Sequence, residues 1–240
     1  MIAENIAAIR ARMDEAARRA GRDPKEILLC AATKMNDASR VREAIAAGVD
    51  CCGENRVQEL VQKSAEHAYD GAPVHFIGHL QTNKVKQVVG KVELIQSVDR
   101  LPLLQCIEKE AARQGIVQDI LLEVNVGGEE SKSGFTPEET PRIAAEMDAF
   151  PHCRLRGLMA IPPVSKNSGD NRRFFAEIQR IAVDIIAKKQ HNIRMDILSM
   201  GMTDDFEDAI ACGSTMVRVG TAIFGARYYG GTPDANGLPK

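Results

Sequence analysis

Lys34 is the residue whose type and position most directly suggest chemistry. It directly follows the apolar stretch "ILLCAAT", residues 27–33, and the helix-starting pair "ND" begins at residue 36. A lysine among apolar residues at the mouth of a sheet is partly desolvated, which favours the neutral, nucleophilic amine, and such an amine forms imines with aldehydes. A solvated or salt-bridged lysine and an anion ligand are the alternatives at this position.

Two later segments predict a phosphate-binding cup. "SMGMTDD" begins at Ser199 and "RVGTAIFG" begins at Arg218, and both place small residues and hydroxyls after a strand-like run. We expect Gly220 and Thr221 to open a short helical turn whose N–H groups point at a phosphate, with Ser199 and Gly201 closing the cup. Ordinary turns are the alternative. A lysine and a phosphate cup on one rim indicate a phosphorylated aldehyde, either the cofactor pyridoxal 5′-phosphate (PLP) or a sugar phosphate.

The carboxylates of Asp204 and Asp205 precede the helix that "DDFEDAIAC" predicts. Carboxylates are favourable at a helix N-terminus, so we expect both residues to cap that helix. Neither should then contact the phosphate.

The cysteines and histidines form no recognisable metal-binding motif. Six cysteines occur without a C-x-x-C pair, and most lie in or beside apolar runs, which predicts buried free thiols. His75 and His79 in "VHFIGHL" have the spacing of a helical zinc site, but in a strand four residues span about 13 Å. They cannot share one ion there, and we predict no metal site. His75 is expected to be a core or rim histidine, whereas His79 lies at the expected strand end, where a functional role stays open.

The elements that must position these residues alternate along the chain. An amphipathic N-terminal helix, with Ile2, Ile6, Ile9 and Met13 on one side, is followed by short apolar runs separated by charged segments of helical period. The expected strands are 27–33, 49–54, 74–80, 93–98, 119–126, 154–161, 195–201 and 215–225. Strands joined by helices pair in parallel, and eight such units in about 200 to 250 residues match a single (β/α)8 TIM barrel with an extra N-terminal helix. An open doubly wound sheet is the alternative.

Length, composition and charge limit the possible functions. The 240 residues, 44% of them hydrophobic, suffice for one large core, which we expect over residues 1–229, followed by a flexible C-terminal tail over residues 230–240. The formal net charge of −2 provides no field that would attract nucleic acid. Charges throughout the N-terminal segment and the lack of a long apolar run predict a cytoplasmic protein with no membrane partner.

Motifs spread over almost the whole chain carry a family resemblance. They are "AGRDPKEILLCAATK", "GENRVQE", "HFIGHLQTNKVK", "SVD", "ESKSGF", "RGLMAIPP" and "LSMGMTDDFEDAIACGSTMVRVGTAIFG". With these motifs the chain resembles the pyridoxal phosphate homeostasis protein family, single-domain barrels related to the N-terminal domain of alanine racemase. The resemblance implies a (β/α)8 fold, PLP held as an aldimine on Lys34, and Arg218 facing the pyridine nitrogen. It also implies a cofactor-facing Asn55 and phosphate contacts around Ser199, Gly201, Gly220 and Thr221.

Two positions depart from the family pattern. Met35 and Asn36 stand where the family usually has a second lysine and a proline shortly after the cofactor lysine, so any role of that second amine does not carry over. Val74 replaces a tryptophan before "HFIGHLQ", which we interpret as a packing change.

Arg218 favours a carrier over a catalyst, because a guanidinium stays protonated and can only donate a hydrogen bond. A pyridine nitrogen facing it stays unprotonated, and such a ring stabilises a substrate carbanion poorly. Alanine racemases also use a second domain and a partner subunit to supply a tyrosine acid. This chain leaves only a dozen or so residues after its last expected unit, and none of Tyr69, Tyr228 and Tyr229 lies at an expected strand end facing the cofactor.

We therefore predict a non-catalytic, monomeric PLP-binding protein that acts in intracellular PLP homeostasis and passes PLP to apo PLP-dependent enzymes. An amino-acid racemase or another PLP enzyme of low activity is the alternative, and a Schiff-base aldolase acting on a sugar phosphate is a third possibility. The loop at residues 125–135 is expected to be a mobile cover over the site. Its Lys132 is expected to be a solvated residue rather than a second group that captures the aldehyde.

Overall fold

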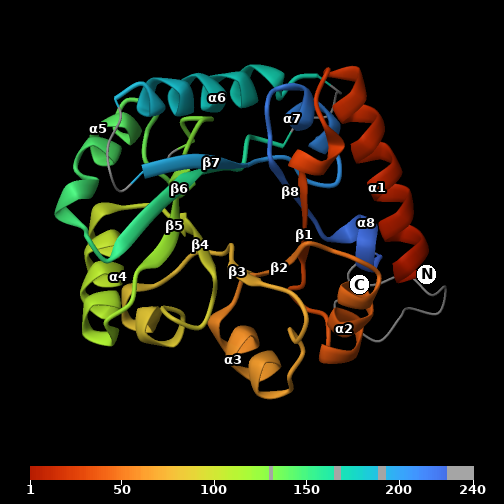
Figure 1. Cartoon of the computed structure of the whole chain (residues 1–240), viewed down its shortest axis with the longest axis horizontal. Coiled ribbons are helices and arrows are strands. Elements are labelled where there is room, and N and C mark those ends of the chain that lie inside the picture. Colours follow the sequence, from red (N-terminus) through yellow and green to blue (C-terminus); the bar gives the residue numbers. More distant parts are fainter. Residues whose placement is uncertain (130–131, 165–168, 189–192, 226–240) are drawn as a thin grey trace.

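Eight parallel strands close into a barrel in the order in which they follow one another in the chain (Figure 1). The computed structural model describes residues 1–129, 132–164, 169–188 and 193–225. The strands are β1 (Leu28–Ala32), β2 (Cys51–Glu54), β3 (Val74–Phe76), β4 (Leu94–Val98), β5 (Gln118–Val124), β6 (Cys153–Ala160), β7 (Ile193–Ser199) and β8 (Met216–Val219). Strand β1 pairs with both β2 and β8, which closes the barrel. The predicted (β/α)8 barrel is confirmed, and the open doubly wound sheet is excluded.

Helices surround the barrel and connect its strands (Figure 1). They are α1 (Ile2–Arg19), α2 (Ala38–Ala46), α3 (Val57–Ala65), α4 (Leu101–Gln114), α5 (Thr140–Ala145), α6 (Arg172–Ile186), α7 (Phe206–Ala211) and α8 (Thr221–Phe224), with 3-10 helices η1 (Pro24–Glu26), η2 (Thr82–Gln87) and η3 (Met147–Ala149). The connection between β3 and β4 contains η2 in place of an α-helix. None of the helices in the described ranges is long and apolar enough to cross a membrane.

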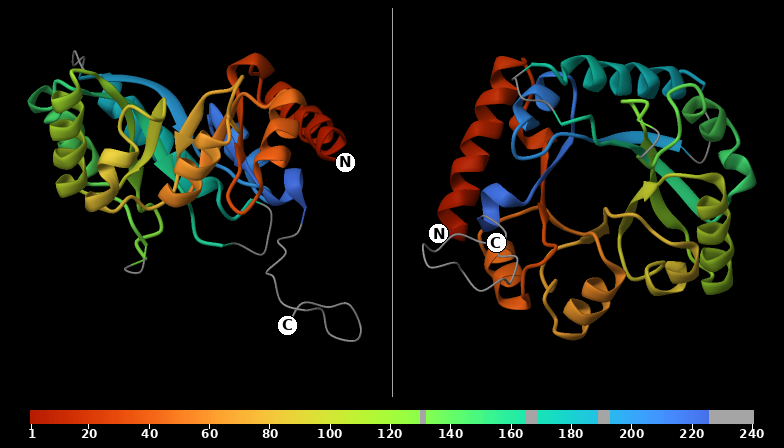
Figure 2. Two further views of the ribbon diagram at one scale, coloured as in Figure 1. Left: turned by 90° about the horizontal axis from the view of Figure 1, so that it is seen from below. Right: turned by 180° about the vertical axis from the view of Figure 1, so that it is seen from behind.

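The extra N-terminal helix is present as predicted. Helix α1 lies against α7 and α8 on the outside of the barrel (Figure 1, Figure 2). Its buried face contains Ile2, Ile6, Ile9 and Met13, which are the residues that the helical period placed on one side.

The third strand is shorter than predicted. Strand β3 ends at Phe76, and the chain then passes so close to Asn55 that a Cβ added at Gly78 would lie 2.2 Å from the Asn55 carbonyl oxygen. Only glycine permits this approach, and the backbone leaves strand geometry there. The expected strand 74–80 is therefore wrong in its second half, and His79 lies in the loop that follows β3.

The last predicted strand divides into two elements at Gly220. Residues 215–225 contain strand β8 and then helix α8, which begins at Thr221. The strand 215–225 is thus too long, but the short helical turn expected to open at Gly220 and Thr221 is confirmed.

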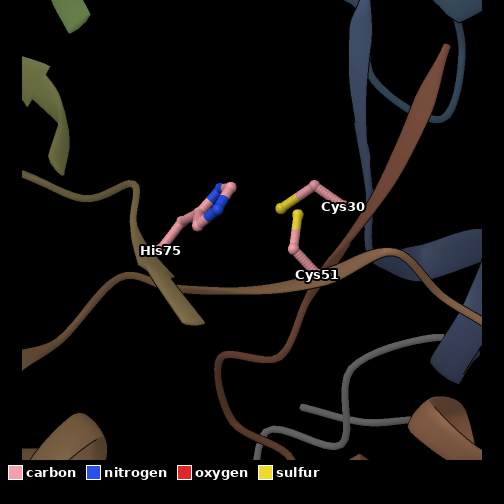
Figure 3. A group of neighbouring side chains, drawn as sticks. All are labelled: Cys30, Cys51 and His75. Carbon is pink, nitrogen blue, oxygen red and sulfur yellow. The ribbon is translucent and has the colours of Figure 1, made fainter. Parts of the chain in front are cut away.

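The interior of the barrel carries thiols as well as aliphatic side chains. Cys30, Cys51 and Met216 form one buried cluster, and the His75 ring points toward the two thiols (Figure 3). All six cysteines are free, and four of them are buried, which confirms the predicted thiols. His75 is buried, which confirms that it is a core histidine.

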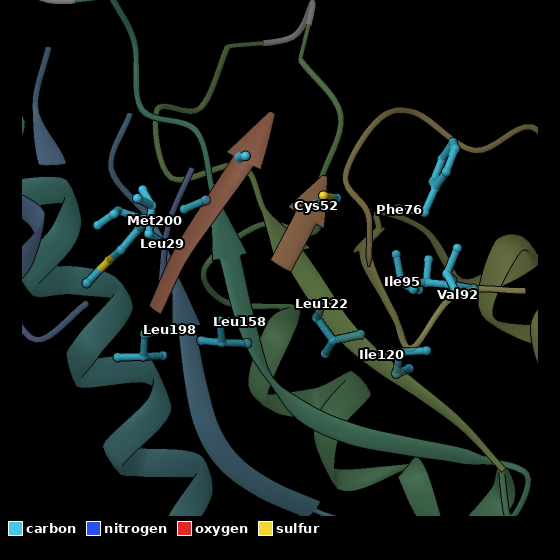
Figure 4. Close-up of a cluster of buried hydrophobic side chains, with 14 of the residues drawn as sticks. Leu29, Cys52, Phe76, Val92, Ile95, Ile120, Leu122, Leu158, Leu198 and Met200 are labelled. Atoms are coloured by element: carbon cyan, nitrogen blue, oxygen red, sulfur yellow. The ribbon is translucent and has the colours of Figure 1, made fainter. Parts of the chain in front are cut away.

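The main hydrophobic core lies between the outer face of the strands and the helices (Figure 4). Leu29, Leu122 and Leu158 are examples of strand residues that point into this layer. Burying one such side chain contributes about 1.5 to 3 kcal/mol, so this layer is the main source of the stability that holds the strand ends in place. The tail expected at residues 230–240 lies outside the described residues.

Candidate functional site

A cavity of about 510 Å³ opens where β1 and β8 end. Four of the residues singled out from the sequence line it together: Lys34, Arg218, Gly220 and Thr221. The rest of its wall consists of Ala32, Met35, Asn36, Asp37, Arg40, Met202, Thr203, Asp204, Phe224 and Gly225. The cavity therefore lies at the C-terminal end of the barrel strands, where barrel chemistry collects.

The turn that follows Lys34 is fixed by specific hydrogen bonds. Met35 has a φ of 60°, in the left-handed region that non-glycine residues seldom adopt. Its N–H donates to Glu59 Oε2 at 2.7 Å, which holds this conformation. Asp37 accepts from the Arg40 N–H at 2.9 Å and caps helix α2, so the helix start expected at "ND" is confirmed.

Beneath this turn lies a buried ion pair that sequence reasoning missed. Lys63 Nζ donates to Glu54 Oε2 at 2.7 Å and to the Thr33 carbonyl oxygen at 2.8 Å. Glu54 also accepts from Thr33 Oγ1 at 3.1 Å and from the Tyr69 hydroxyl at 3.2 Å. Burial, together with the Glu54 carboxylate, raises the pKa of Tyr69. The network joins the ends of β1 and β2 and thereby supports the position of Lys34.

Arg218 is buried in the floor of the cavity. Its Nη1 donates to the carbonyl oxygen and Oγ of Ser199 at 2.6 and 2.7 Å, and its Nη2 donates to the Ala160 carbonyl oxygen at 2.9 Å. Burial lowers the pKa of Arg218. Nearby, burial and the charge of Asp99 raise the pKa of Glu123 to about 7, although Arg218 opposes this shift. Glu123 was also missed from the sequence.

Ser199 and Gly201 do not line the cavity. The Ser199 hydroxyl is fully buried and donates to Gln96 Oε1 at 2.6 Å inside the barrel. Gly201 has a φ of 93°, and an added Cβ would lie 2.9 Å from the Phe206 Cα and 2.6 Å from the Ala209 Cβ. Gly201 thus allows the close packing of α7, and the roles of both residues at a phosphate stay predictions.

Asn55 carries an unsatisfied polar atom. Its N–H donates to Glu54 Oε1 at 2.8 Å, whereas its Oδ1 is buried and has no hydrogen-bond partner within the described part of the chain. Leaving a buried acceptor unpaired costs about 1 to 3 kcal/mol, so such an atom points to a group that donates to it when bound. Asn55 does not line the cavity wall, and its contact with a cofactor stays a prediction.

Asp204 and Asp205 differ from expectation. Asp205 occupies the N-cap position of α7, but its carboxylate makes no capping hydrogen bond to the first turn. It accepts instead from the Met202 N–H at 2.7 Å and from Asn171 Nδ2 at 2.8 Å. The side-chain cap expected from Asp205 is therefore wrong. Asp204 is exposed and forms part of the cavity wall.

His79 and Lys132 lie outside this cavity wall. His79 Nδ1 lies 3.1 Å from Asp99 Oδ2, and its side chain is about half exposed. Lys132 forms an ion pair with Glu129, and its lack of a covalent role stays a prediction. Residues 130 and 131 of the expected cover lie outside the described residues.

The cavity suits a small phosphorylated aldehyde. Its volume falls within the range of about 300 to 1,000 Å³ that is typical of cofactor sites. Its wall contains the guanidinium groups of Arg40 and Arg218, the Lys34 amine and the carboxylates of Asp37 and Asp204. Arg40, which sequence reasoning missed, is held by a 3.0 Å bond from its Nε to Asn36 Oδ1. The two guanidinium groups offer an anionic ligand local positive charge despite the negative net charge of the chain.

Fold and site together define a barrel of the alanine racemase N-terminal domain class, whose family model matches residues 5–228. The chain belongs to the pyridoxal phosphate homeostasis protein family. It is 44% identical to the pyridoxal phosphate homeostasis protein of Pseudomonas aeruginosa over 229 residues, which cover 95% of this chain and 97% of that protein. The protein of that name from Escherichia coli strain K12 is 42% identical, with 95% and 97% covered.

Solved structures agree with this assignment. A crystal structure of an unknown protein from Bifidobacterium adolescentis is 39% identical, has a TM-score of 0.85, and is matched over 93% of this chain and 94% of that chain. PipY of Synechococcus elongatus, solved with PLP bound, is 30% identical, has a TM-score of 0.81, and is matched over 94% of this chain and 100% of that chain.

Proposed function

We propose that this protein binds PLP in the cavity at the C-terminal end of its barrel and acts in intracellular PLP homeostasis. The observation that carries the proposal is the meeting of Lys34, Arg218, Gly220 and Thr221 around one cavity of cofactor size. The PLP-bound structure of PipY supports it, because that chain has the same fold and is 30% identical.

Each of these residues has a distinct role in the proposal. PLP supplies a reactive aldehyde when it is bound, and the Lys34 amine holds it covalently. The backbone N–H groups at the start of α8, at Thr221 beside Gly220, receive the phosphate, because the first N–H groups of a helix have no partner within the helix. Arg218 donates to the pyridine nitrogen.

The remaining predicted contacts belong to the same proposal. Ser199 acts through Arg218, to which its hydroxyl and carbonyl oxygens are bonded. The φ of 93° at Gly201 sets the course of the loop after β7 that borders the cavity. Asn55 offers its unpaired Oδ1 to a donor of the bound ligand.

The role as a carrier and regulator, rather than as an efficient catalyst, rests on two features of the cavity wall. Arg218 can only donate a hydrogen bond, so it keeps the pyridine nitrogen unprotonated and weakens the ring as an electron sink. Within the described residues the wall contains no tyrosine or histidine that could serve as a second acid or base. Loss of such a group typically costs about 10² to 10⁴ in rate. An amino-acid racemase of low activity is the alternative.

The proposal extends to partners and organisation. Residues 1–229 form one PLP-binding domain, and the protein acts as a monomer that releases PLP to apo PLP-dependent enzymes. An adduct at a cavity that opens on the barrel rim is accessible to amines, which suits a protein that must accept and release its cofactor.

Assays on the purified protein distinguish a PLP carrier from an amino-acid racemase. The carrier should be yellow, should reactivate an apo PLP-dependent enzyme when mixed with it, and should racemise or transaminate common amino acids very slowly. Steady-state turnover of an amino acid at about 1 s⁻¹ or faster, lost in Lys34→Ala, would establish the racemase alternative instead.

A further inference from the structure

Three soft ligand groups meet inside the barrel, close to the strand ends opposite the Lys34 cavity. They are the thiols of Cys30 and Cys51 and the imidazole of His75, and their ligand atoms all lie within 4.8 Å of one another (Figure 3). They come from the consecutive strands β1, β2 and β3. No contiguous motif contains them, which is why the sequence predicted no metal site.

Strand register brings the two thiols together. Cys30 and Cys51 are direct partners in the parallel pair β1–β2, and both face the barrel interior. Their neighbour Cys52 faces the opposite way, into the core between strands and helices. Gly53 leaves room for the Cys30 thiol, because an added Cβ at Gly53 would lie 2.9 Å from its Sγ.

Packing holds the three groups with little freedom. The exposed fractions of Cys30, Cys51 and His75 are 0%, 2% and 4%. Gln96 Nε2 lies 2.9 Å from His75 Nδ1 and 3.2 Å from the Met216 sulfur, so it fixes the plane of the imidazole from one side. With the Gln96 amide turned so that its oxygen accepts from the imidazole N–H, this contact becomes the kind of outer hydrogen bond that orients metal-binding histidines in proteins.

We propose that Cys30, Cys51 and His75 bind one thiophilic d10 metal ion, zinc(II) or copper(I). Bonds from the metal of about 2.3 Å to sulfur and about 2.0 Å to nitrogen place the ligand atoms of a three-coordinate ion roughly 3.5 to 4 Å from one another. The ligand atoms in this structure lie within 4.8 Å of one another, so a small movement suffices. Thiolates and imidazole select these ions over magnesium or calcium. Binding releases both thiol protons to solvent, leaves the imidazole neutral and changes no oxidation state.

The two ions differ in how they fit. Zinc(II) with two thiolates is electrically neutral, which favours it in a buried site, and it requires a fourth ligand. Copper(I) tolerates three ligands, and the Met216 thioether in the same cluster is a soft donor that favours it. The shared prediction is a single ion held by the three groups.

A route from solvent to the site exists. A second cavity, of about 350 Å³, includes Cys51, His75 and Met216 in its wall. Its remaining charged groups are five carboxylates and one guanidinium: Glu26, Asp50, Glu93, Asp119, Asp196 and Arg156. Asp50, Asp119 and Asp196 form ion pairs with Arg10, Arg154 and Arg156, so a cation entering here meets a wall in which much of the negative charge is already compensated.

Metal competition tests the proposal on the full chain. The reduced, chelator-treated protein is titrated under nitrogen with zinc(II) and, separately, with copper(I), each against a chromophoric chelator. We expect one ion per chain in at least one of the two titrations. Cys51→Ala should weaken binding at least about 100-fold, beyond the roughly 10- to 100-fold cost of losing an outer hydrogen-bond partner. Cys52→Ala is the matched control, because it removes the adjacent buried thiol that faces the helices, and it should bind as the unmutated protein does.

Two outcomes would overturn the proposed metal site. One is that the unmutated protein binds neither zinc(II) nor copper(I), and the other is that Cys51→Ala binds the ion as tightly as the unmutated protein does. X-ray absorption on the loaded, unmutated protein gives a test that does not depend on the folding of a variant. Sulfur and nitrogen neighbours support the site, whereas a shell of oxygen atoms contradicts it. A count of four free thiols in the denatured protein before reduction, where six are expected, would indicate a disulfide and would also contradict the site.

Discussion

Lys63 Nζ and Glu54 Oε2 form a 2.7 Å ion pair whose two side chains are 6% and 0% exposed. Removing one partner of a buried pair leaves the other charge uncompensated, which costs about 3 to 5 kcal/mol. Lys63→Met should therefore lower the free energy of unfolding by that amount in urea denaturation. Replacing both partners, in Lys63→Met with Glu54→Leu, should restore part of the loss.

The exposed pair of Arg180 and Asp184 is the matched control for this prediction. Arg180→Met should change the free energy of unfolding by less than about 1 kcal/mol, because solvent screens surface pairs. An equally small effect of Lys63→Met would mean that the buried pair does not hold the ends of β1 and β2 together.

Covalent attachment should occur at Lys34 alone. After incubation with PLP and borohydride reduction, peptide mapping should find the cofactor on Lys34, and Lys34→Ala should abolish the fixed adduct. Lys132→Ala should retain it, since Lys132 is held by Glu129 away from the cavity wall. A label found on Lys132 in the unmutated protein would transfer the covalent role to the loop.

The phosphate should be the main anchor once the covalent bond is removed. In Lys34→Ala, PLP should bind at least about 100-fold more tightly than pyridoxal, because two charge-assisted hydrogen bonds together contribute about 3 kcal/mol. Titration followed by absorbance measures both affinities. Equal affinities would contradict a phosphate cup at Gly220 and Thr221.

Glu123 should make stability depend on pH. Its pKa is raised from 4.5 to about 7 in the folded protein, so the folded state keeps a proton that the unfolded state has released. The unfolding free energy should therefore fall as pH rises from about 4.5 to about 7, by up to about 3 kcal/mol.

Glu123→Gln tests this, because it cannot ionise. The variant should match the unmutated protein near pH 4.5 and exceed it in unfolding free energy at pH 8, as measured by urea denaturation. Glu138→Gln, at an exposed glutamate, should leave the pH dependence unchanged. Parallel pH profiles for the unmutated protein and Glu123→Gln would remove this role from Glu123.

The barrel and the Lys34 rim could be predicted because their signals are local. The apolar run before Lys34, the "ND" helix start and the small residues around Gly220 can each be recognised within one short segment. The regular alternation of strand-like and helix-like segments then predicts the barrel. Strand lengths were less predictable, since the end of β3 depends on the contact of Gly78 with Asn55, which comes from another strand end.

The supporting residues could not be predicted because their partners are distant in sequence. Arg40 bonds to the Phe224 carbonyl oxygen, and Cys30, Cys51 and His75 meet only through the strand register. Lys63 carried one usable signal, since it lies on the apolar face of α3, three residues after the buried Leu60. A lysine at such a position requires a buried anion, and Glu54 supplies it.

Closure of the barrel limits how another protein can recognise this one. Because β8 pairs with β1, each strand of the described chain has a neighbour on both sides and none lies at a free edge of the sheet. A partner cannot extend the sheet by adding a strand of its own, which is a common way in which proteins bind peptides. Under the proposed transfer of PLP, recognition of an apo-enzyme would fall to side chains of the rim loops and outer helices, at surface positions that can vary without disturbing the barrel.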